Sequence, residues 1–279
     1  MKNLKKKKLT ISILFIIILS SITLTLDGNN LINSISDKGN FVTKKSSVIN
    51  SIYINDLGVN NWENAVSEGI CTGSGIKDDP YIIENIILGE MINPDGNTIV
   101  QIENSEAYFT IRNIEIYSGE VAMKLINVKN SIIIHSIIKS ENKAIIIENS
   151  YNNNISLNRI IGNNFGISIE DSIDNVISKN FIEISKNYDP YMSSYGISLT
   201  RCNFNNITDN YIEGKCQYGI NALYSDNLIL SFNRISNIEI GINLANSNSI
   251  DIKYNYITCE SRTNDEFDED IICLSLIHI

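Results

Sequence analysis

From Ala122 onward, hydrophobic and polar positions recur in one pattern that is written six times. Successive copies begin 22, 22, 30, 23 and 22 residues apart. Counting each start as position 0, apolar residues occupy positions 1, 3, 11 and 16 of every copy, and most of them are isoleucine. The apolar residues alternate or form short runs ended by Asn, Gly, Asp or Ser, which is typical of strands and turns. The copies begin at Ala122, Ala144, Gly166, Gly196, Gly219 and Gly241.

This repeat predicts a solenoid. A period of 22 residues is too short for repeats built from pairs of helices. Three strands and three turns fit into it and form one rung, about 4.8 Å above the rung before. Residues at the same position then stack, so the isoleucines form internal columns, a role that suits stiff β-branched side chains. We predict an all-β parallel β-helix of about eight rungs over residues 81–270.

Two other recurrent positions are expected to shape the turns. Position 0 is glycine in four of the six copies, which suits a turn with positive φ or close packing. Position 14 is asparagine in five of the six copies. Asparagine tolerates the left-handed region of backbone space, and its amide can bond to the asparagines above and below. We therefore expect an asparagine ladder along the solenoid.

The chain before the repeat divides into three segments. Residues 1–26 join a basic run to an apolar stretch at residues 9–26, which indicates a secretory signal peptide or an uncleaved membrane anchor. Residues 27–49 are polar without periodicity and are expected to form a flexible tether. Residues 50–80 are predicted to cap the open end of the solenoid, with a short helix between Asn60 and Gly69.

The last residues, 271–279, begin like another rung and then stop. No capping sequence follows them, so a chain that ended there would expose a bare strand edge. The sequence therefore predicts a truncated or artefactual end at this point.

The motifs of the repeat resemble a known family. The recurring pattern G-I-x-L … I-x-x-N-x-I, with CTGSG at 71–75 and DPYIIEN at 79–85, is similar to right-handed parallel β-helix repeat proteins of pectin-lyase-like fold. The resemblance covers about residues 50 to 270 and includes exported proteins that are similar to NosD, a periplasmic maturation factor for nitrous oxide reductase. It implies a right-handed parallel β-helix, whereas activity does not follow, because this fold hosts many chemistries.

Net charge and cysteine content narrow the partners. A net charge of −10 argues against nucleic-acid binding, which needs clustered Lys and Arg. The only membrane contact expected is through residues 9–26. The chain has five cysteines, and export would permit disulfides, although their pairing does not follow from the sequence.

The 30-residue copy carries an insertion at 185–195, and a loop that projects from a regular solenoid is a usual place for function. Phe165, Tyr195 and Tyr218 each precede a position-0 glycine, so they should stack on one face. The rings and the loop predict a glycan-binding surface, and the competing interpretation is an aromatic ladder that only joins the turns. The candidate binding residues are Phe165, Tyr188, Asp189, Tyr191, Tyr195 and Tyr218.

No catalytic constellation is visible in the sequence. Asp171 and Asp174 share a copy, as do Arg201 and Asp209, but neither pair recurs at matching positions in a neighbouring copy. His135 fits a surface or turn position better than a base. We therefore assign no catalytic residue and leave the enzyme question open.

Metal and sugar attachment sites are weakly indicated. The acidic run at 265–270 could hold Ca²⁺, but it lacks the spacing of a calcium loop and also suits a solvated loop. Copper would need clustered His, Met or Cys, and no such cluster exists in the sequence, so no metal site or cofactor is assigned. Asn154 and Asn206 begin N-glycosylation sequons, both at position 10 of their copies.

These observations predict an exported or surface-tethered β-helix protein, extracellular or on the cell surface, that acts as a binding or structural module. Polysaccharides or cell-surface glycans are the expected partners. A polysaccharide lyase or glycoside hydrolase of pectin-lyase-like fold is the alternative. A NosD-like accessory for metal maturation is a more distant one.

Overall fold

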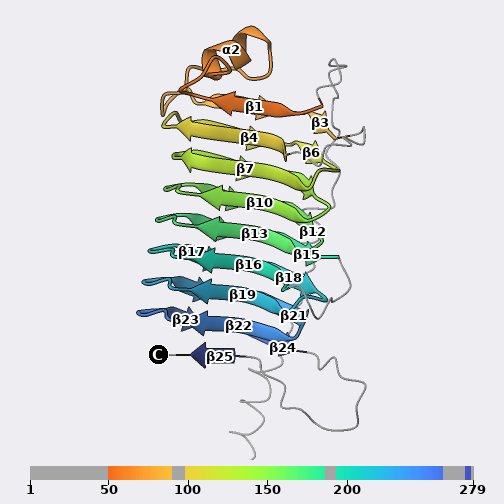
Figure 1. The fold of residues 1–279 in the computed structure, drawn as a ribbon, viewed down its shortest axis with the longest axis vertical. Coiled ribbons are helices and arrows are strands. Elements are labelled where there is room, and N and C mark those ends of the chain that lie inside the picture. Colours follow the sequence, from red (N-terminus) through yellow and green to blue (C-terminus); the bar gives the residue numbers. More distant parts are fainter. Residues whose placement is uncertain (1–49, 90–97, 186–192, 260–273, 278–279) are drawn as a thin grey trace, which may run out of the picture. The chain divides into compact units, whose positions relative to one another are not determined.

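The computed structural model describes residues 50–89, 98–185, 193–259 and 274–277. Their strands form three parallel sheets, called sheets 1, 2 and 3 below, and the chain passes through them in turn (Figure 1). A strand of one turn therefore pairs with the corresponding strand of the next turn. The predicted fold class, an all-β parallel β-helix with a short capping helix, is confirmed.

Sheet 1 contains the longest strands. Its order is β1 (Ile52–Asn55), β4 (Thr98–Ser105), β7 (Val121–Val128), β10 (Lys143–Glu148), β13 (Phe165–Glu170), β16 (Tyr195–Thr200), β19 (Tyr218–Leu223), β22 (Ile240–Ala245) and β25 (Leu274–Ile277).

Sheets 2 and 3 follow in each turn. The order of sheet 2 is β2 (Tyr81–Glu84), β5 (Phe109–Arg112), β8 (Ser131–Ile134), β11 (Asn154–Ser156), β14 (Val176–Ser178), β17 (Asn206–Thr208), β20 (Ile229–Ser231) and β23 (Asp251–Lys253). The order of sheet 3 is β3 (Ile87–Leu88), β6 (Glu115–Ile116), β9 (Ile137–Lys139), β12 (Arg159–Gly162), β15 (Phe181–Ile184), β18 (Tyr211–Gly214), β21 (Arg234–Ile238) and β24 (Tyr256–Cys259).

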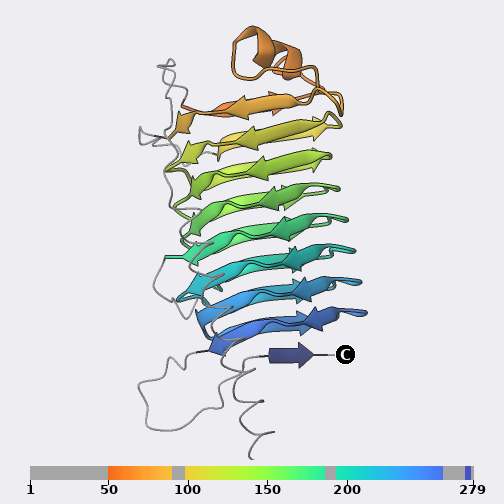
Figure 2. The ribbon, with the colours of Figure 1, turned by 180° about the vertical axis from the view of Figure 1, so that it is seen from behind.

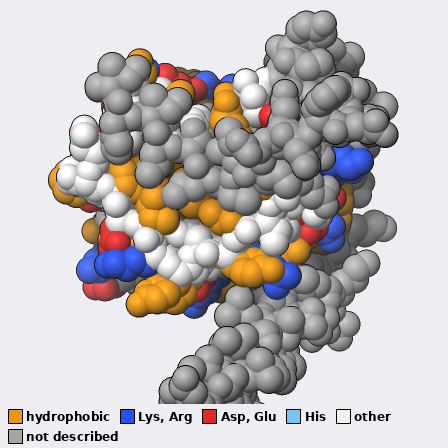
Figure 3. Space-filling model, turned by 90° about the horizontal axis from the view of Figure 1, so that it is seen from below, with side chains coloured by type: hydrophobic (Ala, Val, Ile, Leu, Met, Phe, Trp, Pro, Cys, Tyr) orange, Lys and Arg blue, Asp and Glu red, His pale blue; other side chains and the backbone are white. Residues whose placement is uncertain are grey.

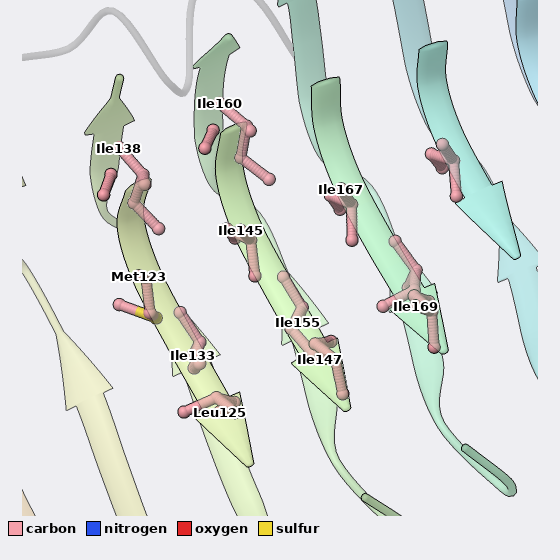
Figure 4. Packing of buried hydrophobic residues seen from close by; sticks show 14 of the residues in the cluster. Met123, Leu125, Ile133, Ile138, Ile145, Ile147, Ile155, Ile160, Ile167 and Ile169 are labelled. Atoms are coloured by element: carbon pink, nitrogen blue, oxygen red, sulfur yellow. The ribbon is translucent and has the colours of Figure 1, made fainter. Parts of the chain in front are cut away.

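The four predicted apolar columns form the core. Met123, Ile145 and Ile167 are register partners at position 1, and all three are fully buried. Figure 4 shows that this column and the columns at positions 3, 11 and 16 point into the space between the sheets. Seen from below, the charged side chains of the described residues lie mainly around the periphery (Figure 3). The sequence pattern thus correctly assigned the inward faces of all three sheets.

The position-0 glycines are required by close packing. A Cβ on Gly196 would lie 2.4 Å from Ile212 Cγ2 and 2.6 Å from the carbonyl oxygen of Gly219. Gly166 and Gly219 meet the same two kinds of neighbour. None of the three has a positive φ, so the alternative of a left-handed turn is wrong and the close-packing alternative is confirmed.

The predicted asparagine ladder exists, but its backbone conformation was assigned to the wrong residue. The Nδ2 of Asn180 donates to Asn210 Oδ1 at 3.1 Å and to the carbonyl oxygen of Ile155 at 2.8 Å. The left-handed conformation belongs to the preceding residue, for example Lys179 with φ 55°. That residue turns the chain, so that the asparagine side chain points inward and bonds between rungs.

The capping helix covers the edge of the first turn. α2 (Trp62–Ser67) begins after Asn61, whose side chain accepts a hydrogen bond from the Asn64 N–H at 3.0 Å. It lies beyond β1 at one end of the strand stack (Figure 2). The segment 50–80 also supplies β1 itself, which pairs with β4. Cap and first strand are therefore continuous in sequence.

One buried hydrogen-bond network fastens the cap. Trp62 is 1% exposed and stacks on Tyr81 with ring centroids 4.7 Å apart. Its Nε1 donates to Ser105 Oγ at 2.8 Å, and Ser105 Oγ donates to Asp56 Oδ2 at 3.0 Å. The network joins α2 to sheet 1.

Replacing Ser105 with alanine should loosen this cap. The Trp62 N–H loses its acceptor, and we expect a loss of about 2 kcal/mol of stability. Because Trp62 is the chain's one tryptophan, its fluorescence reports the cap directly. The midpoint of thermal unfolding followed by this fluorescence should be lower in Ser105→Ala. Ser74→Ala, at an exposed hydroxyl, is the control. An unchanged fluorescence midpoint in Ser105→Ala would contradict the assignment.

Several predicted segments lie outside the described residues. These are the signal or anchor at 1–26, the tether at 27–49 and the acidic run at 265–270. Within 271–279, β25 continues sheet 1, with Leu274 paired to Ile242. In the part of the chain that the structure describes, no helix is long and apolar enough to cross a membrane.

Candidate functional site on the outer face of sheet 1

The outer face of β13 and β16 brings three kinds of side chain into adjacent columns. At the start of the two strands lie the rings of Phe165 and Tyr195, which are register partners. The next outward column contains the register partners Ser168, which is half-buried, and Ser198, which is buried. A column of charged side chains follows where the strands end. One strip across two strands thus changes from aromatic to hydroxyl to charged.

The aromatic column is the one that the sequence predicts. Phe165 and Tyr195 have ring centroids 4.9 Å apart, and Tyr195 stacks on Tyr218 at 5.3 Å with an interplanar angle of 11°. The ammonium group of Lys143 lies 4.6 Å from the Phe165 ring centroid. All three rings are partly exposed. Neighbouring rings of the column cover each other's faces, so the column exposes mainly ring edges.

The charged column contains a cross-rung cluster that sequence reasoning missed. Arg201 Nε donates to Asp171 Oδ1 at 2.6 Å, and its Nη2 donates to Asp171 Oδ2 at 2.8 Å and also to Glu170. Hydrogen bonding from Arg201 holds the pKa of Asp171 below its usual range, and the same partners raise the pKa of Arg201. Asp171 therefore stays ionised down to a lower pH than a free aspartate, and this bond weakens only as pH falls through that lowered pKa.

A second ion pair lies toward the N-terminus and joins this column to the neighbouring one. Lys124 Nζ lies 3.1 Å from Glu148 Oε2, and Glu148 is the register partner of Glu170. Both glutamates occupy position 4 of consecutive copies. This shared position was the sequence signal that could have predicted the charged column. It was missed because acidic residues were compared with other residues of the same rung, whereas partners across a solenoid come from the next rung.

The structure brings together only part of the predicted site. Phe165, Tyr195 and Tyr218 form one column, as expected. Tyr188, Asp189 and Tyr191 fall within 186–192, outside the described residues, so their contribution stays a prediction. His135 is an exposed turn residue with φ 52°, as the sequence indicated.

The two sequon asparagines lie on another face. Asn154 and Asn206 point outward from β11 and β17 in sheet 2 and are half-buried. Their Oδ1 atoms are buried without a hydrogen-bond partner. Glycosylation at these residues stays a prediction.

Three parallel sheets, built from strands that stack turn upon turn, define a parallel β-helix protein. Within that class, the chain belongs to the NosD family, because the family model described as periplasmic copper-binding protein (NosD) matches residues 73–269. No curated protein matches the chain.

Solved structures give weaker likenesses. The enzymatically active domain of bacteriophage CBA120 tailspike protein 2 matches at 9% identity and a TM-score of 0.43, over 62% of this chain and 34% of that domain. The chain thus spans about a third of the length of that domain. The A-module of Azotobacter vinelandii mannuronan C-5 epimerase AlgE6 matches at 11% identity and a TM-score of 0.31, over 60% of this chain and 68% of the module.

The described residues do not fit a copper site. Copper prefers His, Cys or Met ligands brought close together. The described part of the chain holds no group of three or more His, Cys, Asp or Glu that could bind a metal ion. Cys71 and Cys202 are buried thiols, and burial raises the pKa of each to about 11. Thiols with such pKa values are poor metal ligands at neutral pH, so we derive no copper chemistry here.

Proposed function

We propose that this chain is an exported β-helix protein that binds a glycan on the outer face of sheet 1, over β13 and β16. The observation that carries the proposal is the strip formed by Phe165 and Tyr195, Ser168 and Ser198, and the Arg201 cluster. Sugars offer hydroxyls for polar side chains and apolar C–H groups for aromatic ones, and both kinds of partner lie side by side here. The predicted secretory segment and the periplasmic family description support export.

The state of the carboxylates favours binding over catalysis. Glycoside hydrolysis needs a carboxylic acid that keeps its proton near neutral pH and so has a raised pKa. The pKa of Asp171 is instead lowered by Arg201, and Glu170 and Glu148 each pair with a cation. Charged groups held in such pairs can orient a ligand by hydrogen bonds without transferring a proton.

A carbohydrate-active enzyme is the second candidate. The observation that favours it is the placement of Glu148 and Glu170 on the outer faces of neighbouring strands, since most glycoside hydrolases use two carboxylates. A screen for polysaccharide depolymerisation tests this candidate. Turnover that disappears in Glu170→Gln would replace the binding proposal with the enzymatic one.

Replacing Tyr195 with alanine should weaken glycan binding about tenfold or more, because the column loses its central ring. Binding is measured on a glycan array and then by titration of the strongest hit. Tyr211→Ala is the matched control, since Tyr211 stacks on Phe181 in sheet 3 at 5.2 Å. Both variants lose a ladder ring and should lose similar stability. Equal affinities in the two variants would show that the Phe165–Tyr195–Tyr218 column is only structural.

The predicted loop provides a further arm of the same experiment. Tyr191→Ala should reduce affinity without changing the melting temperature, if the loop at 185–195 contributes to the site. Tyr188 and Asp189 are tested in the same way. Loss of binding in Tyr195→Ala alone would restrict the site to the sheet.

A further inference from the structure

The outer face of sheet 2 is uncharged over five consecutive strands. On β8, β11, β14, β17 and β20 the outward side chains are aliphatic, hydroxyl or carboxamide groups. This stands out in a chain with a net charge of −10. Ion pairs lie at both ends of the face: Glu84 with Arg112 at 2.7 Å, and Asp251 with Lys253 at 2.7 Å. Each end is therefore locally neutral.

The column at position 10 of this face is symmetric about its centre. Its register partners in consecutive strands are Ile132, Asn154, Val176, Asn206 and Ile229. Val176 on β14 lies in the middle, an asparagine lies one strand away on each side, and an isoleucine two strands away. Ile132 and Ile229 are similarly exposed, at 42% and 43%.

The two asparagines have an unmet bonding requirement. Asn154 Oδ1 and Asn206 Oδ1 are shielded from solvent and accept no hydrogen bond. A buried carboxamide oxygen without a donor is costly. Both side chains lie in the outward column of the same face and are half-buried. Rotation of each carboxamide about its last side-chain torsion would bring the oxygen to the surface, where a donor on a docked partner could satisfy it.

We propose that this face is a self-association surface, on which a second copy of the chain docks around a two-fold axis that runs along β14. Rotation about such an axis keeps the strand direction and reverses the order of the strands. Val176 then faces Val176 of the second copy, Asn154 faces Asn206, and Ile132 faces Ile229. The carboxamides pair reciprocally across the interface, as an isologous contact requires.

The lack of charge and the narrowness of the face determine how strongly two copies are expected to associate. Two copies that both carry −10 repel each other over most of their surfaces, and the outward strand residues of this face add no charge to that repulsion. Tyr151 and Ile173, each about 40% exposed, extend the apolar area along the turn before β11 and β14. The strands of this face are only three or four residues long, so the contact is narrow and association should be weak and dependent on concentration.

A charge-swap experiment on the full chain tests the arrangement. Sedimentation velocity across a concentration series should show dimers for the unaltered chain. Asn154→Lys with Asn206→Lys places like charges opposite each other. This variant should raise the dissociation constant of the dimer at least about 100-fold. Asn154→Lys with Asn206→Glu places opposite charges across the axis and should restore dimers. Circular dichroism confirms that each variant is folded.

Every outcome of this experiment decides the proposal. A monomeric unaltered chain would overturn it. Dimers that persist in the double-lysine variant would show that association uses another part of the chain. The N-terminal segment, which all variants share, would be one such part. A charge-swapped chain that stays monomeric would rule out this two-fold arrangement. A glycan found by mass spectrometry on Asn154 or Asn206 would block the face and also overturn the proposal.

Discussion

Replacing Asn180 with alanine is expected to lower the free energy of unfolding by about 4 kcal/mol, because several buried polar groups lose their partner at once. Asn180 Oδ1 accepts from the N–H of Asn158 at 3.0 Å and from its Nδ2 at 3.1 Å. The Asn180 Nδ2 donates hydrogen bonds to the Ile155 carbonyl oxygen and to Asn210 Oδ1. All of these groups are buried, so water cannot replace the missing amide.

The matched control for this variant is Asn154→Ala. Asn154 lies on the neighbouring strand β11, but its side chain points outward and its Oδ1 accepts no hydrogen bond. Because that oxygen accepts no hydrogen bond, replacing Asn154 should not lower stability. Chemical denaturation at low protein concentration compares the two. Similar losses in both variants would mean that the ladder contributes little and that the isoleucine columns alone hold the rungs together.

Gly196→Ala is the second substitution with a large expected effect, a loss of about 3 kcal/mol. The new Cβ would lie within 2.6 Å of a backbone carbonyl oxygen on the next rung and within 2.4 Å of Ile212 Cγ2. The carbonyl oxygen belongs to a paired strand and cannot move without disturbing sheet 1. Thermal unfolding should show a lower midpoint, in contrast to the gain that Gly→Ala gives at unstrained sites.

Ala144 provides the comparison for Gly196, because it occupies position 0 in an earlier rung and is fully buried. Ala144→Gly should cost only about 1 kcal/mol, mainly through chain entropy. If Gly196→Ala were no more harmful than Ala144→Gly, the rungs would be able to separate locally, and the close-packing explanation of this column would be wrong.

The sequence was most informative where one residue type recurs at one position. Ile155, Ile177 and Ile207 share position 11, and the structure stacks them as register partners. A second asparagine ladder was missed. Asn153 Nδ2 donates to Asn175 Oδ1 at 3.0 Å, and Asn175 Nδ2 donates to Asn205 Oδ1 at 3.1 Å. These residues occupy position 9, which is asparagine in only three of six copies, so the signal was weaker.

Local preference also misled the assignment of turn conformations. Asparagine commonly adopts positive φ, yet at position 14 it does not. Leu157 and Phe232, which precede ladder asparagines, have φ 56° and 57°, although bulky side chains rarely adopt such angles. The rung must turn there, and pairing on both sides holds the backbone in place, so stacking between rungs outweighs the local cost.

The candidate site was likewise predicted only in part from the sequence. The sequence places Phe165, Tyr195 and Tyr218 in one column because all three precede a position-0 glycine. It also places Asp171 and Arg201 at position 5 of consecutive copies, but their bond did not follow, because which charged groups of adjacent rungs meet depends on rotamer as well as on position.

The sequence by itself therefore determined the solenoid, its apolar columns, its capping helix and the ladder at position 14. Each follows from a period that any stacked arrangement must repeat, so the physical cause is present in every copy. Only the tertiary structure decided which glycines are closely packed, which residues turn left-handed, how the charges pair across rungs and which outer face is free of charge. These depend on what the neighbouring rung presents at a distance of about 4.8 Å, and a single copy of the repeat does not contain that information.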